Sequence, residues 1–348
     1  MSDNAIYWLW LREAATPAKA RKLLETYESP EKIYDRTNYS EAPYIKNEAL
    51  TKLLDKNISR AKKILDTCRE KGIEILTPDL VSYPKRLLNI PDYPIVLFAK
   101  GKIPDWDTVF GVGVVGTRHL SDSGRGKTRK ICKGLTASGA AIISGFAEGA
   151  DTVAAETAIS SGSFTVAVLG CGVDVVYPKS NALLYTKLIN NGLFLSEYPP
   201  GTTPMPYYFP TRNRIIAALS RCVIVTEAPE KSGSVITGNL AIRYGIDLFA
   251  IPDKDSGTDL LINSGAVAVT EAEEITQKYS ELPEKLIEEV SVVSDNPIIA
   301  LLEKGDLCID DICPKLGMSM TECNSKCFML ELEGKIRKLP GGFYSISL

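Results

Sequence analysis

The middle of this 348-residue chain is constrained most strongly by short, unbroken apolar runs that alternate with helical segments. An apolar run without polar alternation is typical of a strand that is buried on both faces, as in a parallel sheet. Strands that alternate with helices predict right-handed crossovers and a doubly wound, Rossmann-like α/β fold. The predicted strands lie at residues 108–115, 140–143, 164–169, 193–195, 222–226 and 248–251.

The segments on either side of this domain have different patterns. Residues 1–75 place apolar side chains at helical spacing, which predicts a small N-terminal helical domain. Five prolines in residues 76–106 predict an irregular connector that carries one short strand at 95–98. Three short helical segments and a Gly-Gly hairpin at the C-terminus are the pattern of a winged helix. The remaining boundaries are 107–280 for the Rossmann-like domain, 281–294 for a linker and 295–348 for the winged helix.

The composition is that of a folded globular protein, with 45% apolar and 24% charged residues, which excludes general disorder. The 40 basic and 43 acidic residues give a net charge of -3, so any nucleic-acid site has to be local. The longest apolar run near the N-terminus, residues 5–11, is far shorter than the roughly 20 residues that span a bilayer. We therefore expect a cytoplasmic protein without membrane insertion.

The cysteines do not indicate a disulfide scaffold or a metal site. Eight in 348 residues are too few for such a scaffold, so we expect reduced thiols. Four of them fall close together near the C-terminus, but without the paired C-x2-C spacing of a zinc ribbon and with apolar neighbours. We predict buried thiols there, and neither a metal nor a cofactor. These four are Cys308, Cys313, Cys323 and Cys327.

Two nucleotide-binding patterns are misplaced for the function that they usually indicate. Gly111, Gly113 and Gly116 spell G-x-G-x-x-G, but the first two fall inside the predicted strand, whereas a dinucleotide site needs them in the turn after it. The P-loop-like residues 124–128 lack the glycine that the motif requires at position 121, where Ser121 stands. We therefore expect neither NAD binding nor ATP hydrolysis, and we assign no catalytic residue.

Four loops at predicted strand ends and helix starts combine glycine with small hydroxyl side chains. In an open α/β sheet, ligands bind outside the carboxyl ends of the strands. Glycine permits close approach there, and N–H groups at a helix start attract anions, so four such loops suggest several phosphates. A tight turn that needs glycine for packing is the alternative for any one loop. The loops contain Gly116, Thr117 and Arg118; Ser144, Gly145 and Phe146; Gly170 and Gly172; and Gly233 and Ser234.

Charge is unevenly distributed over the predicted α/β domain. Residues 118–133 and 179–221 together hold eleven basic and two acidic side chains, whereas residues 227–275 hold three basic and nine acidic ones. Such a local basic side suits an extended polyanion. Phe146, or an aromatic cluster at 207–209, could stack on unpaired bases, and this cluster precedes a basic triplet that could meet phosphates. The triplet is Arg212, Asn213 and Arg214.

An enzyme remains the alternative. Asp151, Asp174 and Glu197 follow predicted strand ends, where α/β enzymes keep catalytic groups, although helix capping also explains acidic residues at such positions. The alternative is a nucleotide-processing hydrolase that acts on a nucleoside monophosphate, with Asp174 or Glu197 as acid or base. A transcription factor that binds duplex DNA through the winged helix is a second alternative.

The motifs themselves resemble those of the DNA-processing protein A (DprA/Smf) family. The resemblance covers residues 83–270 and includes Gly116-Thr117-Arg118, the loops at 144–151 and 167–174, Tyr177-Pro178, the segment 209–216 and the Ser-Gly-Ser at 232–234. It implies a protein that is not an enzyme, binds single-stranded DNA and forms a homodimer through its central domain. It further implies that this protein protects incoming DNA in natural transformation and loads a RecA-type recombinase.

The resemblance also assigns roles to residues and domains. Arg118 and Lys179 would be the principal phosphate contacts, joined by Arg212, Asn213 and Arg214. The N-terminal helices would be a sterile-alpha-motif-like (SAM-like) domain and the C-terminal unit a winged helix. Residues 295–348 hold six basic and eight acidic residues, which is unfavourable for gripping a duplex, so we expect the winged helix to contact protein.

Overall fold

The structure is a computed structural model that describes residues 4–254, 256–279, 296–302, 307–339 and 342–346. The chain divides into two compact units, Met1–Glu284 and Lys285–Leu348. The boundary falls in the predicted 281–294 linker, which itself lies outside the described residues. None of the helices in the described parts of the chain has the length and apolar character needed to span a membrane.

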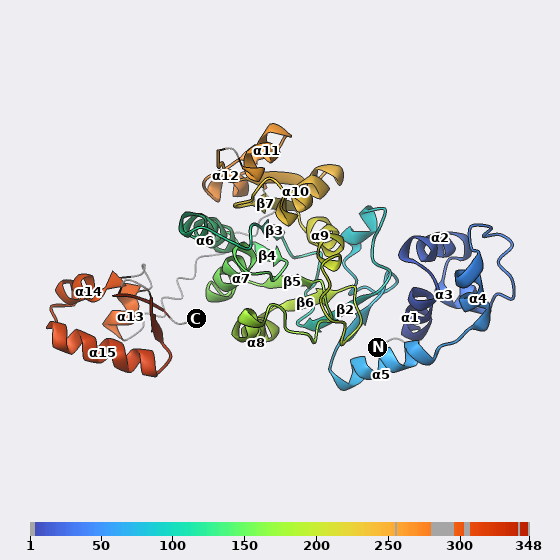
Figure 1. Ribbon diagram of the computed structural model, residues 1–348, viewed down its shortest axis with the longest axis horizontal. Coiled ribbons are helices and arrows are strands. Elements are labelled where there is room, and N and C mark those ends of the chain that lie inside the picture. Colours follow the sequence, from blue (N-terminus) through green and yellow to red (C-terminus); the bar gives the residue numbers. More distant parts are fainter. Residues whose placement is uncertain (1–3, 255, 280–295, 303–306, 340–341, 347–348) are drawn as a thin grey trace. The chain divides into compact units, whose positions relative to one another are not determined.

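A nine-stranded sheet forms the centre of the first unit, in the order β1-β2-β6-β5-β4-β3-β7-β8-β9 (Figure 1). The strands from β6 to β9 in this order are parallel, whereas β1 and β2 are antiparallel at one edge, and the predicted α/β fold is confirmed. The order reverses between β3 and β7, which is where such sheets bind ligands. The bounds are β1 Glu74–Leu76, β2 Leu97–Gly101, β3 Gly111–Val115, β4 Ala141–Ser144, β5 Thr165–Leu169, β6 Leu193–Ser196, β7 Cys222–Val225, β8 Asp247–Ala250 and β9 Val267–Ala268.

Helices cover both faces of the sheet, and this is why β3 to β7 are buried along their whole length. Apolar residues of α6, α7, α8 and α12 pack on one face of the sheet, and those of α9, α10 and α11 pack on the other. Figure 1 labels these helices around the strands. Serine side chains cap the first turns of α6, α10 and α11. The bounds are α6 Asp122–Ala137, α7 Ala150–Ser160, α8 Ala182–Asn191, α9 Tyr208–Leu219, α10 Gly233–Arg243, α11 Gly257–Asn263 and α12 Glu273–Thr276, with short 3-10 helices η1 Lys85–Asn89 and η2 Lys179–Asn181.

The N-terminal helices share one apolar core with the antiparallel edge of the sheet. Leu65 and Cys68 of α5 belong to the same cluster as Ile75 of β1, Phe98 of β2 and Phe194 of β6. The segment expected to be an irregular connector therefore supplies β2 to the sheet, and β1 begins just before it. The bounds are α1 Ala5–Ala14, α2 Pro17–Tyr27, α3 Pro30–Asp35, α4 Asn47–Asp55 and α5 Ser59–Glu70.

The second unit has the helices and the hairpin of the predicted winged helix. Its small core includes Cys313, Cys323 and Cys327, whereas Cys308 is half-buried, and all four are free thiols. Burial raises the pKa of Cys323 to about 12, so this thiol stays protonated. The bounds are α13 Pro297–Leu302, β10 Leu307–Cys308, α14 Ile309–Leu316, α15 Met320–Leu332, β11 Ile336–Lys338 and β12 Phe343–Ile346.

Candidate functional site

A cleft of about 330 Å³ opens beside the reversal of strand order, at the carboxyl end of β3. The loop after β3 forms one wall, and the first turns of α9 and α10 form the other. The two walls bring together residues that are 87 to 122 positions apart in the sequence. We call this the strand-end cleft. It is lined by Val115, Gly116, Thr117, Arg118, His119, Ala147, Asp151, Pro206, Phe209, Pro210, Arg212, Asn213, Ile216, Ser232, Gly233, Ser234 and Thr237.

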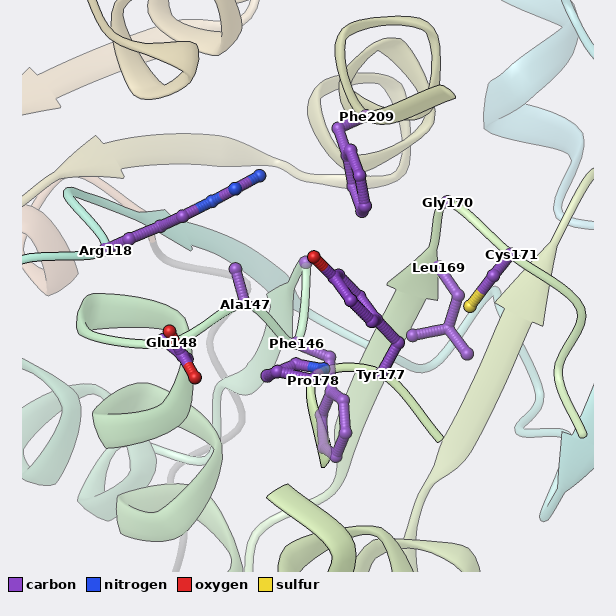
Figure 2. A pocket seen from close by; sticks show the side chains of 11 residues that line it. Arg118, Phe146, Ala147, Glu148, Leu169, Gly170, Cys171, Tyr177, Pro178 and Phe209 are labelled. Atoms are coloured by element: carbon purple, nitrogen blue, oxygen red, sulfur yellow. The ribbon is translucent and has the colours of Figure 1, made fainter. Parts of the chain in front are cut away.

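A smaller aromatic pocket of about 30 Å³ adjoins the strand-end cleft and shares Arg118 and Phe209 with it. Figure 2 shows Phe209 extending from α9 toward Tyr177, with Arg118 reaching toward the same ring. The Phe209 and Tyr177 rings are 5.7 Å apart, and the guanidinium carbon of Arg118 lies 5.1 Å from the Phe209 centroid. Arg118 is exposed and Tyr177 is 39% exposed, so a cation and an aromatic face are both accessible here.

The loop after β4 is already occupied by a carboxylate of the protein. Asp151 accepts hydrogen bonds from the backbone N–H groups of Gly145 at 3.1 Å and Ala147 at 3.2 Å. Burial raises the pKa of Asp151, while Arg212 and these N–H donors act in the opposite direction. The Asp151 carboxylate therefore occupies the place where we expected the loop at Ser144 and Gly145 to bind a phosphate, and Ser144 is only 2% exposed.

Phe146, expected to stack on a base, lies in the core instead. Its side chain is 1% exposed, and its ring packs against that of Phe194 with centroids 5.2 Å apart. Its backbone has a φ of +60°, an unusual conformation for a residue with a side chain, and this conformation belongs to the tight loop that Asp151 holds. The structure therefore argues against Phe146 as a stacking residue.

The basic triplet is buried inside α9 and has partners within the protein. Arg212 is 5% exposed and donates to the backbone carbonyls of Gly145 and Val168, and burial lowers its pKa to about 10. Asn213 donates to the carbonyl of Gly233 at 3.1 Å. Direct DNA contact by this triplet stays a prediction. The structure favours a supporting role, because Arg212 and Asn213 donate hydrogen bonds to the backbone of the loops at Gly145 and Gly233.

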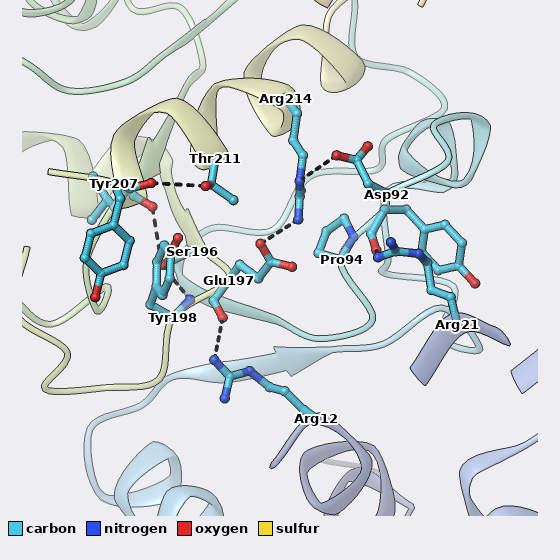
Figure 3. Close-up of polar contacts among 12 residues, drawn as sticks. Arg12, Arg21, Asp92, Pro94, Ser196, Glu197, Tyr198, Tyr207, Thr211 and Arg214 are labelled. Atoms are coloured by element: carbon cyan, nitrogen blue, oxygen red, sulfur yellow. Dashed lines mark hydrogen bonds and ion pairs between the residues drawn. The ribbon is translucent and has the colours of Figure 1, made fainter. Parts of the chain in front are cut away.

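Arg214, unlike Arg212 and Asn213, does not line the strand-end cleft. Its guanidinium contacts Glu197 at 2.6 Å and Asp92 at 3.3 Å, and only 7% of its side chain is exposed (Figure 3). Glu197 is one of the carboxylates that the hydrolase alternative would use, and it does not line the strand-end cleft. An internal ion pair thus accounts for both residues.

The remaining predicted residues fall into exposed and packed groups. Lys179 at the start of η2 and Gly233 at the start of α10 are exposed, whereas Thr117 and Ser234 are buried at 7% each. At the other loop glycines, a side chain would come too close to neighbouring atoms. Close packing, the alternative given above for these loops, therefore explains why glycine stands there. An added Cβ would lie 2.5 Å from Ala150 at Gly116, 2.9 Å from the Phe209 ring at Gly170 and 2.8 Å from the Pro199 carbonyl at Gly172.

Asp174, the other carboxylate of the hydrolase alternative, is a structural anchor. It accepts hydrogen bonds from the Lys71 ammonium at 2.5 Å and from the Gly201 N–H at 2.8 Å. Burial raises its pKa, but these hydrogen bonds outweigh burial and hold the pKa below its ordinary value. Within the described ranges, no three His, Cys, Asp or Glu residues are grouped so that they could hold a metal ion.

Tyr177 is the site residue that sequence reasoning missed as an aromatic contact. Its ring reaches Phe209 although 32 positions separate the two in the sequence. The available signal was the Tyr-Pro dipeptide directly before Lys179, which places an aromatic ring beside a predicted phosphate contact.

Comparison with protein families gives two matches. The model of the family DNA recombination-mediator protein A matches residues 74–280, and that of the DprA winged helix domain matches residues 294–342. Protein Smf of Synechocystis sp. is 34% identical over 295 residues, which cover 81% of this chain and 74% of that protein. DNA processing protein DprA of Streptococcus pneumoniae is 43% identical over 202 residues, which cover 57% of this chain and 71% of that protein.

Two solved structures are similar to this one. The X-ray structure of DNA processing protein A from Streptococcus pneumoniae has a TM-score of 0.70 at 34% identity, and the match covers 80% of this chain and 98% of that one. A structure of DNA processing protein A from Helicobacter pylori, described for its single-stranded DNA binding mode, has a TM-score of 0.55 at 31% identity and covers 59% and 94%.

Proposed function

Because the chain belongs to the DNA recombination-mediator protein A (DprA/Smf) family, we propose that it binds single-stranded DNA along the strand-end cleft and the aromatic pocket. The observation that carries this proposal is the exposed Arg118 guanidinium beside the Phe209 and Tyr177 rings, at the reversal of strand order. A cation next to accessible aromatic faces matches a strand whose phosphates and unpaired bases alternate.

Each group in the site has a part in this proposal. Arg118 and Lys179, both exposed, meet phosphates, and the N-terminus of α10 at Gly233 adds partial positive charge. Phe209 and Tyr177 stack on bases. Stacking tolerates any base because each has a π face, so we expect weak sequence preference.

We further propose that the protein acts in the cytoplasm in DNA processing during natural transformation, where it protects incoming strands and loads a RecA-type recombinase. The relatives named DNA processing protein support the processing role. Homodimerisation through the central domain is part of the same proposal. Exposed apolar side chains on α10, α11 and β9, toward the β9 end of the sheet, support it, namely Ile236, Ile242, Leu260 and Val267.

We propose that the protein is not an enzyme. The hydrolase alternative needs Asp174 or Glu197 free to move a proton near a bound nucleotide. Each is instead held by a cation, Asp174 by Lys71 and Glu197 by Arg214, and neither lines the strand-end cleft. This arrangement supports binding over catalysis.

A titration with oligothymidylates of increasing length tests the function, because a strand-binding protein gains affinity with length until its site is filled. We expect the affinity to fall steeply with salt, as released counterions require. Mononucleotides provide the comparison: saturation by thymidine monophosphate, with release of phosphate or base, would instead identify the hydrolase. Length-independent binding would contradict the proposal.

A further inference from the structure

A third cavity, of about 520 Å³, lies between the N-terminal helices and the loop that follows β6. One face of α5 lines it through residues at i, i+3, i+4 and i+7, and the facing wall is the loop at 198–202 with Tyr208 of α9. We call it the α5 groove. It is lined by Arg12, Arg60, Lys63, Ile64, Thr67, Tyr198, Pro199, Pro200, Gly201, Thr202 and Tyr208.

The basic side chains of the α5 groove outnumber the acidic side chains that pair with them. Arg12 and Arg60 both pair with Glu13, so one carboxylate serves two guanidinium groups. Lys63 is exposed and has no ion-pair partner among the described residues. Three cations against one anion leave a net charge of about +2, which attracts a polyanion.

Aromatic rings line the opposite wall. The Tyr198 and Tyr208 rings lie 3.9 Å apart at an interplanar angle of 34°, and Tyr207, which is 61% exposed, lies 4.6 Å from Tyr208. Cations on one side and rings on the other repeat the chemistry of the strand-end cleft. This combination suits unpaired bases and their phosphates rather than a small inorganic anion.

The first turn of α9 joins the two sites. Tyr208 lines the α5 groove, and the next residue, Phe209, lines both the aromatic pocket and the strand-end cleft. Consecutive Cα atoms are about 3.8 Å apart, so the two sites share one short stretch of backbone. Tyr207, whose ring is 61% exposed, directly precedes this turn as the N-cap residue of α9.

The walls of the α5 groove are fastened to each other. Asp174 accepts one hydrogen bond from Lys71, directly after α5, and another from the N–H of Gly201 in the facing loop. Pro199 and Pro200 restrict the backbone of that loop. The groove is therefore a preformed surface and does not need to assemble around its ligand.

We propose that the α5 groove holds a second stretch of the single strand bound in the strand-end cleft, so that the path of the DNA crosses the first turn of α9 onto the N-terminal helices. The proposal rests on the proposed function. It extends the binding site of the central domain to a second domain, with Lys63 and Arg60 contacting phosphates and Tyr208 contacting a base.

Charge reversal at Lys63, read out with short and long oligonucleotides, tests this path. Oligothymidylates of about 6 and about 24 nucleotides span the range from one partial site to several. We expect Lys63→Glu to weaken binding of the long strand about 5- to 10-fold and to leave the short strand unchanged, since one or two phosphate contacts are lost. Lys63→Ala should lower the salt slope for the long strand by about 0.7.

Lys62→Glu is the matched control, because Lys62 is exposed on the same helix but does not line the α5 groove. We expect it to bind both strands like the unmodified protein. Equal effects of Lys63→Glu and Lys62→Glu on the long strand, or an equal effect of Lys63→Glu on both lengths, would overturn the inference.

Arg118→Ala separates this inference from the function on which it rests. If Arg118→Ala weakens both strands while Lys63→Glu behaves like Lys62→Glu, the function stands and only the path over α5 is wrong. If the unmodified protein binds neither strand, the proposed function fails and the inference fails with it.

Discussion

Two arginines approach the ring of Phe209 from different environments. Arg118 lies 5.1 Å from the ring centroid and is exposed, whereas Arg212 lies 5.9 Å from it and is 5% exposed. Arg118 can exchange its water for a phosphate at little cost. Arg212 already donates to backbone carbonyls, and removing it would take away the cation that favours the charged form of the buried Asp151 carboxylate. The proposed DNA binding thus depends on the Arg118 guanidinium, whereas folding depends on that of Arg212.

Replacing Arg118 with alanine should therefore affect binding and spare folding. We expect single-strand affinity to fall by about 1–3 kcal/mol, the usual size of a charge-assisted contact. Fluorescence anisotropy with an oligothymidylate at fixed salt measures the affinity, and thermal unfolding checks the fold. Arg125→Ala, at an exposed position of α6 outside the cleft, is the control. Unchanged affinity of Arg118→Ala would show that the phosphate contact is misplaced.

Asp174 predicts a pH dependence of stability. Hydrogen bonds from Lys71 and Gly201 overcome the effect of burial and keep its pKa below the ordinary 3.8, so the folded state favours the carboxylate. The stability that it contributes is present above pH 3.8 and is lost as the pH falls through the lowered folded pKa.

We expect Asp174→Asn to be less stable than the unmodified protein at pH 7 by about 1 kcal/mol, because Lys71 is partly exposed and solvent screens the pair. The gap should narrow progressively below pH 3.8. Urea unfolding at pH 7 and at a pH below 3.8 measures this difference in stability. Asp66→Asn, in an exposed pair with Arg69, should show almost no gap at either pH. A gap of equal size in acid would rule out the proposed role of the carboxylate.

At the scale of elements, the strands followed from local pattern but the burial of α9 did not. Each predicted strand in residues 107–270 corresponds to one of β3 to β8, because an unbroken apolar run can only be buried on both faces. In α9, Arg212 and Arg214 have the appearance of a basic surface patch in the sequence. They are buried because α9 packs against both the sheet and the neighbouring α10. Arg214 pairs with Glu197 and Asp92, and Arg212 interacts electrostatically with Asp151, and all three carboxylates come from distant segments. Such pairing cannot be read from local sequence.

For the candidate site, the sequence likewise indicated where the loops lie but not what each residue in them contacts. Glycine at strand ends correctly marked the loops, but glycine serves both anion binding and close packing, and the sequence does not separate the two. Gly170 leaves room for the Phe209 ring, whereas an added Cβ at Gly233, at a helix start, would meet only the side-chain amide of Asn213, at 3.9 Å. The distinction depends on which atoms the fold places opposite each glycine.

The β9 end of the sheet gives a prediction about the proposed dimer. Leu260 of α11 is 45% exposed and Val267 of β9 is 49% exposed, at a sheet edge that a second copy could cover. We expect Leu260→Glu to shift the protein from dimer to monomer, measured by size-exclusion chromatography with light scattering. Leu183→Glu is the control, because Leu183 is 81% exposed on α8, far from this edge in strand order. A dimer that persists in Leu260→Glu would contradict the placement of the dimer interface at the β9 end of the sheet.

At the scale of the whole molecule, the two units have different surface chemistry. The first unit has exposed cations beside aromatic rings, whereas α15 of the second exposes Phe328, Met329 and Leu332 at 58%, 55% and 68%. In a winged helix that binds a duplex, the helix presented to the groove needs cationic and polar side chains. Apolar side chains at these positions, together with a net charge of -2 over residues 295–348, suit a protein partner.

A chain that ends at Glu284 should therefore bind an oligothymidylate within about twofold of the full-length affinity, because each unit is compact and the proposed DNA contacts all lie in the first. Residues 285–348 alone should show no measurable affinity for a duplex in the same anisotropy assay, since duplex binding depends on neutralising phosphates. Circular dichroism of both fragments checks that each is folded. Duplex binding by the folded C-terminal fragment would instead favour the transcription-factor alternative, and loss of single-strand binding by the folded N-terminal fragment would move part of the DNA site into the winged helix.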